Sequence, residues 1–261
     1  MSFDDFDNRA QFPADLPPTM QAGLALLPKS RPIVLLTRHS IRELVDDQGF
    51  AGYKLPLTDQ GRRLAYAWGE HFCAWTERKF HACLSSPIGR CVETAALMLE
   101  GSLLNSFNGS QSVSKSVMES TSQPDVIKNS LLVEPGSFVQ DGESLGPLFR
   151  QYGALEFINH FLGQRIAGMK NPVQGVLDIL GLLHKHLPNQ ENSALLAVSH
   201  DTILAVFLAV MQREFVVSTD DWPEMMEGVF LWFEGDRFED SQVHWVWRGV
   251  AYSRLVSSFV V

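Results

Sequence analysis

Short apolar runs without polar alternation are the feature of this sequence that most constrains its fold. Ile33-Val34-Leu35-Leu36-Thr37 and Ala194-Leu195-Leu196-Ala197-Val198 are the clearest of them. Such runs are typical of strands buried on both faces, as in a parallel sheet, because a strand with one solvent face would alternate. Shorter runs at Ala82-Cys83-Leu84 and Leu131-Leu132-Val133 predict two further strands of this kind.

The segments between these runs have the apolar spacing of helices. Thr58 is placed to cap one helix, and Ser86-Pro87 predicts the start of another, which runs through Met98. Further helices are expected over 149–166, 173–187 and 201–212, and late strands over 228–233 and 242–247. Strands that alternate with helices indicate an α/β fold, a three-layer sandwich with a central, mostly parallel sheet flanked by helices.

The chain is expected to form a single domain over residues 1–261, because no stretch shows an internal repeat or a separate core. Two segments depart from the alternation of strands and helices. Residues 101–130 contain nine serines and little apolar periodicity, which predicts a mobile insertion that early proteolysis would cut. Residues 149–188 are predicted to form a small helical cap insertion.

Charge and cysteine content disfavour several classes of function. The net charge of −9 repels nucleic acid and anionic membranes, so a small substrate is the expected partner. Cys73, Cys83 and Cys91 include no Cys-x-x-Cys spacing, which argues against a disulfide framework and a cysteine-based zinc site. Because no apolar run is long enough for a signal peptide or a membrane span, the protein is expected to be soluble and cytoplasmic.

Histidines and arginines stand where the predicted strands end. Arg38-His39 closes the first buried strand, and Ser199-His200-Asp201 closes a later one directly before a helix. Arg90 falls in the first turn of the helix that follows the strand at 82–84. In open α/β sheets ligands bind at the carboxyl ends of the strands. These cations are therefore expected on one rim of an otherwise acidic protein, and such a cluster calls for an anionic ligand.

A phosphoryl group suits this set of side chains. Arginine presents a planar fork of donors that matches phosphate oxygens. A neutral imidazole nitrogen is able to attack phosphorus and hold the group covalently, and a second histidine is able to stabilise its equatorial oxygens. A neighbouring carboxylic acid would protonate the leaving oxygen. The reaction needs neither a metal nor a cofactor.

Four motifs in this order resemble those of the histidine phosphatase superfamily. Arg38-His39-Ser40-Ile41-Arg42 is similar to its Arg-His-Gly-x-Arg signature, with serine in place of glycine, and Leu57-Thr58-Asp59-Gln60-Gly61 is similar to its Leu-Thr-x-x-Gly helix start. Ser85-Ser86-Pro87 with Arg90 resembles the second arginine motif. Val198-Ser199-His200-Asp201-Thr202 resembles the His-Asp motif of the acid phosphatase branch.

The resemblance implies a role for each pocket residue. His39 would be the phosphorylated nucleophile and His200 the second pocket histidine. Phosphate would be bound by three arginines, Arg38, Arg42 and Arg90.

Two carboxyl groups are candidates for the proton donor to the leaving group. Asp201 matches the acid phosphatase motif and is narrowly preferred, although the positive end of its helix favours the ionised carboxylate. Glu134 is the alternative, because Leu132-Val133-Glu134-Pro135-Gly136 resembles the segment that holds the glutamate of the phosphoglycerate mutase-like branch.

The expected function is hydrolysis of a small phosphorylated metabolite through a phosphohistidine. A phosphoglycerate mutase-like phosphotransferase and a catalytically inactive phosphate-binding module are the alternatives. A metal-dependent phosphohydrolase would need further His and Asp ligands, and the sequence offers no matching set. A serine hydrolase built from Ser199, His200 and Asp201 fails because neighbours at a strand end cannot line up as a triad.

Overall fold

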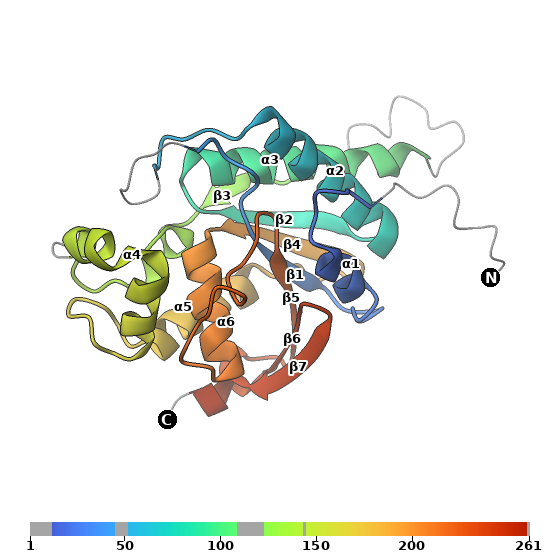
Figure 1. The fold of residues 1–261 in the computed structure, drawn as a ribbon. Coiled ribbons are helices and arrows are strands. Elements are labelled where there is room, and N and C mark those ends of the chain that lie inside the picture. The colour runs from blue at the N-terminus through green and yellow to red at the C-terminus, as the bar shows by residue number, and fades with distance from the viewer. Residues whose placement is uncertain (1–11, 45–51, 109–122, 143–144, 260–261) are drawn as a thin grey trace.

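A central sheet with helices on both faces organises the part of the chain that the structure describes. The structure is a computed structural model, and it describes residues 12–44, 52–108, 123–142 and 145–259. Within these ranges the sheet has seven strands in the order β3-β2-β4-β1-β5-β6-β7 (Figure 1). The expected three-layer α/β sandwich is confirmed. The sheet was expected to be mostly parallel and is mixed, because three of its strand pairings are parallel and three are antiparallel.

The parallel part of the sheet consists of β3 (Val126–Lys128), β2 (Lys79–Ser85), β4 (Ser193–Ser199) and β1 (Ile33–Arg38). Every residue of β1 and β4 is buried, as their unalternating apolar sequences predict. The register places Arg38 beside Ser199. Both strands therefore end at the same edge of the sheet, and His39 and His200 follow them directly.

The rest of the sheet is an antiparallel meander of β5 (Gly228–Glu234), β6 (Gln242–Trp247) and β7 (Val250–Leu255). It joins the parallel part where β5 pairs antiparallel with β1. β5 and β6 confirm the two late strands expected from the sequence. β7 has no counterpart among the expected strands, because its residues are exposed or half-buried and form no apolar run.

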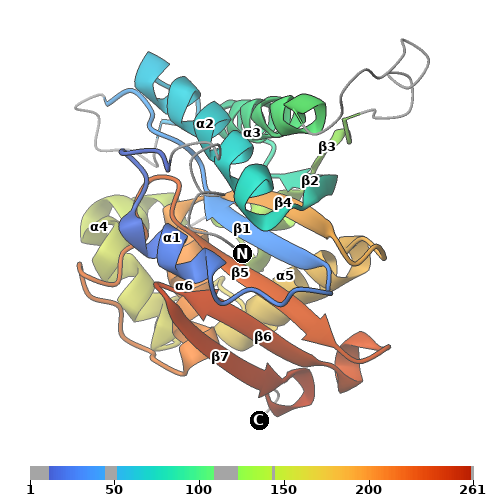
Figure 2. The ribbon, with the colours of Figure 1, turned by 90° about the vertical axis from the view of Figure 1, so that its right-hand side faces the viewer.

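Alternate side chains of β1 enter two cores on opposite faces of the sheet. Ile33 and Leu35 pack with α2 (Asp59–Thr76) and α3 (Gly89–Asn108), whereas Val34 and Leu36 pack with α4 (Leu145–Leu162), α5 (Pro172–His186) and α6 (Asp201–Gln212). Figure 2 shows the two helical layers on either side of the sheet. The short α1 (Pro18–Leu24) joins the first layer through Met20 and Leu24.

The predicted strand over 131–133 is wrong. Ser130–Leu132 is a 3-10 helix, η3, and the neighbouring edge strand is β3, which ends three residues before Leu131. The side chain of Asn129 accepts a hydrogen bond from Leu131 N (2.9 Å) and so starts a turn where the sequence pattern predicted a strand. Ser199 Oγ then donates to Leu132 O (2.8 Å), which ties η3 to the end of β4.

The third helix differs from its predicted limits at both ends. α3 begins at Gly89, after Ser86-Pro87, and the side chain of Ser86 lies 2.9 Å from His200 Nε2 and accepts from Ile88 N (3.4 Å). It continues to Asn108, beyond the predicted Met98, so the first part of the expected 101–130 insertion is helical. Residues 109–122, the serine-rich centre of that insertion, lie outside the described residues.

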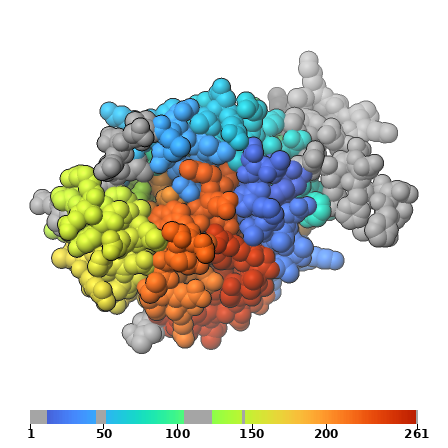
Figure 3. Space-filling view, viewed as in Figure 1, coloured from blue at the N-terminus to red at the C-terminus, as the bar shows by residue number. Residues whose placement is uncertain are grey.

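The expected helical cap over 149–188 corresponds to α4 and α5. α5 packs against α6 and β4 and is part of a helical layer of the sandwich. α4 lies at the margin of the molecule (Figure 1). In Figure 3, the orange surface of α6 and the loop that follows it lies between the yellow-green of α4 and the blue N-terminal segment. Among the described helices, none combines the length and apolarity that a bilayer span requires.

Glycine permits the close approach of α2 and α3. A Cβ atom at Gly69 would clash with the carbonyl oxygen of Met98. We expect Gly69→Ala to lower the free energy of unfolding by about 1–3 kcal/mol, because packed backbone has to shift. Gly181→Ala in α5 is the matched control, since its Cβ would make only ordinary contact with Phe238 at 3.6 Å.

The control variant should raise the free energy of unfolding by about 0.5–1 kcal/mol, as removal of a helix-interior glycine does. Urea unfolding measures both variants. A Gly69→Ala protein as stable as Gly181→Ala would show that the two helices are free to separate.

Candidate active site

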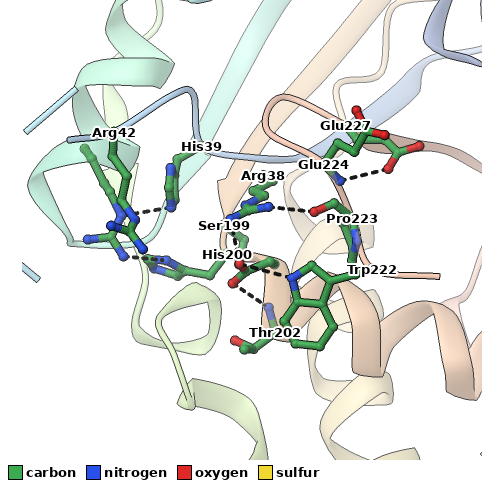
Figure 4. A network of polar contacts seen from close by, with 12 residues as sticks. Arg38, His39, Arg42, Ser199, His200, Thr202, Trp222, Pro223, Glu224 and Glu227 are labelled. Carbon is green, nitrogen blue, oxygen red and sulfur yellow. Dashed lines mark hydrogen bonds and ion pairs between the residues drawn. The ribbon is translucent and has the colours of Figure 1, made fainter. Parts of the chain in front are cut away.

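Residues at the ends of β1 and β4 and at the start of α3 meet at one edge of the sheet. The ring centroids of His39 and His200 lie 5.5 Å apart (Figure 4). Arg90 lies between the rings: its Nε donates to His39 Nε2 (2.9 Å), and its Nη2 lies 3.3 Å from His200 Nδ1. The structure thus brings together three residues predicted from separate motifs.

His39 is held in one tautomer. Its Nδ1 lies 2.8 Å from Ser40 O, and because a carbonyl only accepts, Nδ1 carries the proton and Nε2 keeps a lone pair. Burial, followed by the charge of Arg90, holds the pKa of His39 well below its ordinary value. A neutral imidazole with a free Nε2 is the nucleophilic form of histidine.

His200 is fixed in the opposite tautomer. Its Nε2 lies 2.9 Å from Ser86 Oγ, and its Nδ1 accepts from Arg90, so Nε2 carries the proton. Burial, then Arg90, lowers the pKa of His200 to about 3. Ser86 is therefore a site residue that sequence reasoning assigned to helix capping. The sequence feature that indicates this role is the position of Ser86 beside Pro87 in the second arginine motif.

Arg42 adds its charge to the same rim. The residue is half-buried, with Nη1 donating to Glu43 O (3.0 Å). After burial, the charge of Arg42 is among the causes that lower the pKa of both Arg38 and Arg90, which indicates how near the guanidinium groups are. Like charges this close favour a bound anion.

Asp201 is the ion-pair partner of Arg38. Its Oδ2 lies 2.6 Å from Arg38 Nη2 and accepts from Trp222 Nε1 (3.3 Å), and its Oδ1 accepts from Thr202 N (2.9 Å). An arginine, an indole N–H and a backbone N–H thus surround this carboxyl group, which orients Arg38.

Glu134 lies in a buried and mostly apolar environment. It is 5% exposed and borders a cavity whose other lining is mostly apolar, including Phe138 and Phe157. Burial, and then the negative charge of Asp201, raises the pKa of Glu134 to about 7, against the opposing charges of Arg90 and Arg38. Near neutral pH Glu134 therefore keeps much of its proton, and of the two candidate donors it has the better environment.

Ser40, which stands where the related motif has glycine, ties the site to its surroundings. The buried Ser40 Oγ donates to Gly61 O (2.7 Å) at the start of α2. Ser40 N donates to Thr94 Oγ1 (3.1 Å), which itself donates to Arg90 O (2.7 Å). The serine side chain points to the helix start and does not fill the pocket. Thr94 is a further site residue, in the motif but without an assigned role.

Possible metal ligands do not gather at this edge. Among the residues that the structure describes, no group of three or more His, Cys, Asp or Glu could hold a metal ion. His184, one of two neighbouring helix histidines, packs its ring against Phe233 and Phe238.

Sequence comparison points to one superfamily. The sequence model of the histidine phosphatase superfamily (branch 1) matches residues 34–106, which hold the first three of the four motifs. Together with the fold, this match confirms the resemblance to that superfamily. A search of curated protein sequences gave no significant match.

Solved structures share the fold at low sequence identity. "Mycobacterial hydrolase 1" has a TM-score of 0.56 and 15% identity, covering 83% of this chain and 98% of that one. The mycobacterial glucosyl-3-phosphoglycerate phosphatase has a TM-score of 0.53 and 14% identity, covering 83% and 98%. The phosphoglycerate mutase of Bacillus anthracis strain Sterne has a TM-score of 0.50 and 14% identity, covering 88% and 96%. The fold is thus shared by a phosphatase and a mutase.

Proposed function

We propose that this protein, related to the histidine phosphatase superfamily by its sequence match and fold, hydrolyses a small phosphomonoester through a phosphohistidine at His39. The observation that carries the proposal is the contact between His39 and Arg90. The unprotonated Nε2 of a neutral His39 faces a guanidinium group at 2.9 Å. A nucleophile and an oxyanion donor are thus adjacent, at a strand edge where anions bind.

In the first step, a phosphoryl group enters between His39 and Arg90 and replaces their hydrogen bond. His39 Nε2 forms a bond to phosphorus as the bond to the leaving oxygen breaks. Arg90 and Arg42 donate to the non-bridging oxygens, where charge resides during transfer. Burial and then the charge of Arg90 lower the pKa of His200, and the dianion offsets the second of these causes. His200 Nδ1 then takes up a proton from solvent and donates to the phosphoryl group.

The leaving oxygen takes its proton from Glu134, whose raised pKa suits a general acid near neutral pH. Asp201 holds Arg38 against the pocket through their contact of 2.6 Å. In the second step water attacks the phosphohistidine, the Glu134 carboxylate accepts a proton from that water, and phosphate leaves with His39 restored. Metal-independent hydrolysis results.

The test is a panel of sugar phosphates, phosphoglycerates and nucleotides assayed with a chelator present. We expect release of inorganic phosphate that the chelator does not reduce. Interconversion of phosphoglycerates without phosphate release would instead identify a mutase-like transferase, which uses the same intermediate. Phosphate binding without any turnover would identify an inactive binding module.

Arg90→Ala should lower kcat by about 10²- to 10³-fold, or ~3 kcal/mol, as loss of one oxyanion donor typically does. Arg90 is the arginine in contact with both histidines, so no neighbouring donor replaces it. Arg62→Ala is the matched control, because Arg62 pairs with Glu93 and Asp59 outside this pocket. Steady-state kinetics on a hydrolysed ester measures both, and equal kcat values would remove Arg90 from the mechanism.

A further inference from the structure

Arg248 occupies a turn position that its residue type disfavours. β6 and β7 are joined by the two-residue turn Arg248-Gly249, in which both φ angles are positive (47° and 75°). Hairpin turns of this kind favour Asn, Asp or Gly at the first position. At positive φ a Cβ atom lies too close to a backbone carbonyl oxygen; Gly has no Cβ, and Asn and Asp offset the cost with local hydrogen bonds. A disfavoured conformation that persists points to a role for the side chain.

The Arg248 guanidinium binds several parts of one loop. It forms a bidentate pair with Glu227, Nε to Oε1 at 2.8 Å and Nη2 to Oε2 at 3.0 Å. It also donates to the carbonyl oxygens of Asp220 and of Trp222, the latter at 3.1 Å. Glu227 is 2% exposed, and its Oε2 accepts from Glu224 N (3.0 Å). One arginine thus fastens residues 220–227, the loop that leads into β5.

The 220–227 loop supplies contacts to the ion pair of the phosphate pocket. Pro223 O accepts from Arg38 Nη1 (2.7 Å), and Trp222 Nε1 donates to Asp201 Oδ2 (3.3 Å). Glu227 O accepts from Arg38 N (3.0 Å). The loop therefore holds Arg38 at both its backbone and its guanidinium group, as Figure 4 shows for the side-chain contacts.

We propose that Arg248 is a positioning residue, which fixes the Arg38–Asp201 pair in its phosphate-binding geometry by holding the 220–227 loop. Without the guanidinium group, the Glu227 carboxylate loses its charged partner and keeps only neutral donors, Glu224 N and Thr19 Oγ1, and two loop carbonyls lose a donor. Pro223 and Trp222 are then free to shift, and Arg38 loses its orientation toward the pocket. The expected loss of turnover rests on the proposed function. The expected loss of phosphate binding does not, and it is measured separately.

The hairpin itself offers a substitution that separates this role from folding. Arg248→Asn places Asn-Gly in the turn, the favoured pair at these backbone angles, and removes the guanidinium group. Glu227→Gln is combined with it, because a buried carboxylate left alone destabilises a protein strongly. Arg237→Asn is the matched control, because Arg237 is an exposed arginine between β5 and β6 that pairs with Glu239 and Asp240.

The measurements are the Kd for inorganic phosphate by calorimetry and kcat/KM for a hydrolysed ester. We expect the Glu227→Gln/Arg248→Asn variant to lose about 10- to 100-fold in both, the scale of effect that misplacing a binding group produces. In an Arg38→Ala background the same pair of substitutions should add no further loss. Arg237→Asn should match the parent protein in both measurements.

An unchanged phosphate Kd, or an equal loss in the Arg38→Ala background, would overturn the proposal. If the double variant fails to fold, Arg248→Lys replaces it, because an ammonium group keeps a cation beside Glu227 but lacks the fork that spans the carboxylate and both carbonyls. Its phosphate binding should still weaken, and unchanged binding would count against the role. A parent protein that binds phosphate but hydrolyses no ester would refute the proposed function alone, since the Kd values still decide the role of Arg248.

Discussion

The His39→Ala variant is expected to lose phosphomonoester turnover by a factor on the order of 10⁴ to 10⁶ in kcat, as loss of a catalytic nucleophile does. Among the residues that the structure describes, no other side chain takes the place of His39. His200 lies across the pocket, but its Nε2 is engaged with Ser86, and its Nδ1 faces Arg90. Without Nε2 of His39, the covalent step has no atom to receive the phosphoryl group.

Two measurements separate a lost nucleophile from a damaged fold. Brief reaction with a labelled substrate, quenched by denaturation, should leave an acid-labile, alkali-stable label on the parent protein and none on His39→Ala. Phosphate binding should persist in the variant, because Arg38, Arg42 and Arg90 remain. His81→Ala, which alters an exposed histidine of β2, should behave as the parent protein does. Full activity in His39→Ala would end the phosphohistidine mechanism.

The sequence was most informative where a single physical requirement dominates. β1 and β4 are buried on both faces, and only unbroken apolar runs satisfy that environment. Because parallel strands end at a common edge, His39 and His200, which follow those runs, were expected at the same edge, and the adjacency of β1 and β4 makes them neighbours. Their convergence was therefore predictable without any knowledge of their side-chain contacts.

Short apolar segments carried much less information. Leu131-Leu132-Val133 has the composition of a buried strand, yet the chain turns at Asn129 and buries Leu132 from a 3-10 helix. Three residues are too few to show whether apolar side chains recur with the period of a strand or with that of a helix. β7 was missed for the opposite reason: an edge strand with exposed side chains has no apolar pattern to recognise.

Side-chain contacts between residues that lie in no motif and at no strand end could not be predicted. Glu227 and Arg248 lie in no motif, and their pairing depends on how the hairpin folds back on the 220–227 loop. The narrow preference for Asp201 over Glu134 as proton donor was likewise formed without knowledge of such contacts, and the identity of the donor stays a prediction. The helix start at Asp201 was visible in the sequence, but its ion pair with Arg38 and the burial of Glu134 were not.

Glu134→Gln is expected to lower kcat for alkyl phosphates by about 10²- to 10⁴-fold, the usual contribution of a general acid. Hydrolysis of p-nitrophenyl phosphate should fall far less, because nitrophenolate leaves without needing a proton. Asp201→Asn should reduce both reactions to a similar extent, since it removes the partner that orients Arg38 and leaves proton transfer untouched. Parallel kinetics with the two substrates compares these losses directly.

The pH dependence of the reaction is a second, independent test of Glu134 as the proton donor. Burial raises the pKa of Glu134 from 4.5 to about 7, so the acid form persists to neutral pH and is lost as the pH rises through about 7. In the parent protein kcat/KM for an alkyl phosphate should therefore fall across that range, and in Glu134→Gln this fall should be absent because the amide does not titrate. Suppose instead that Asp201→Asn selectively impairs alkyl esters and abolishes the fall, while Glu134→Gln impairs both substrates equally. The proton would then come from Asp201, and its ion pair with Arg38 would have to open in the substrate complex before any proton could be transferred.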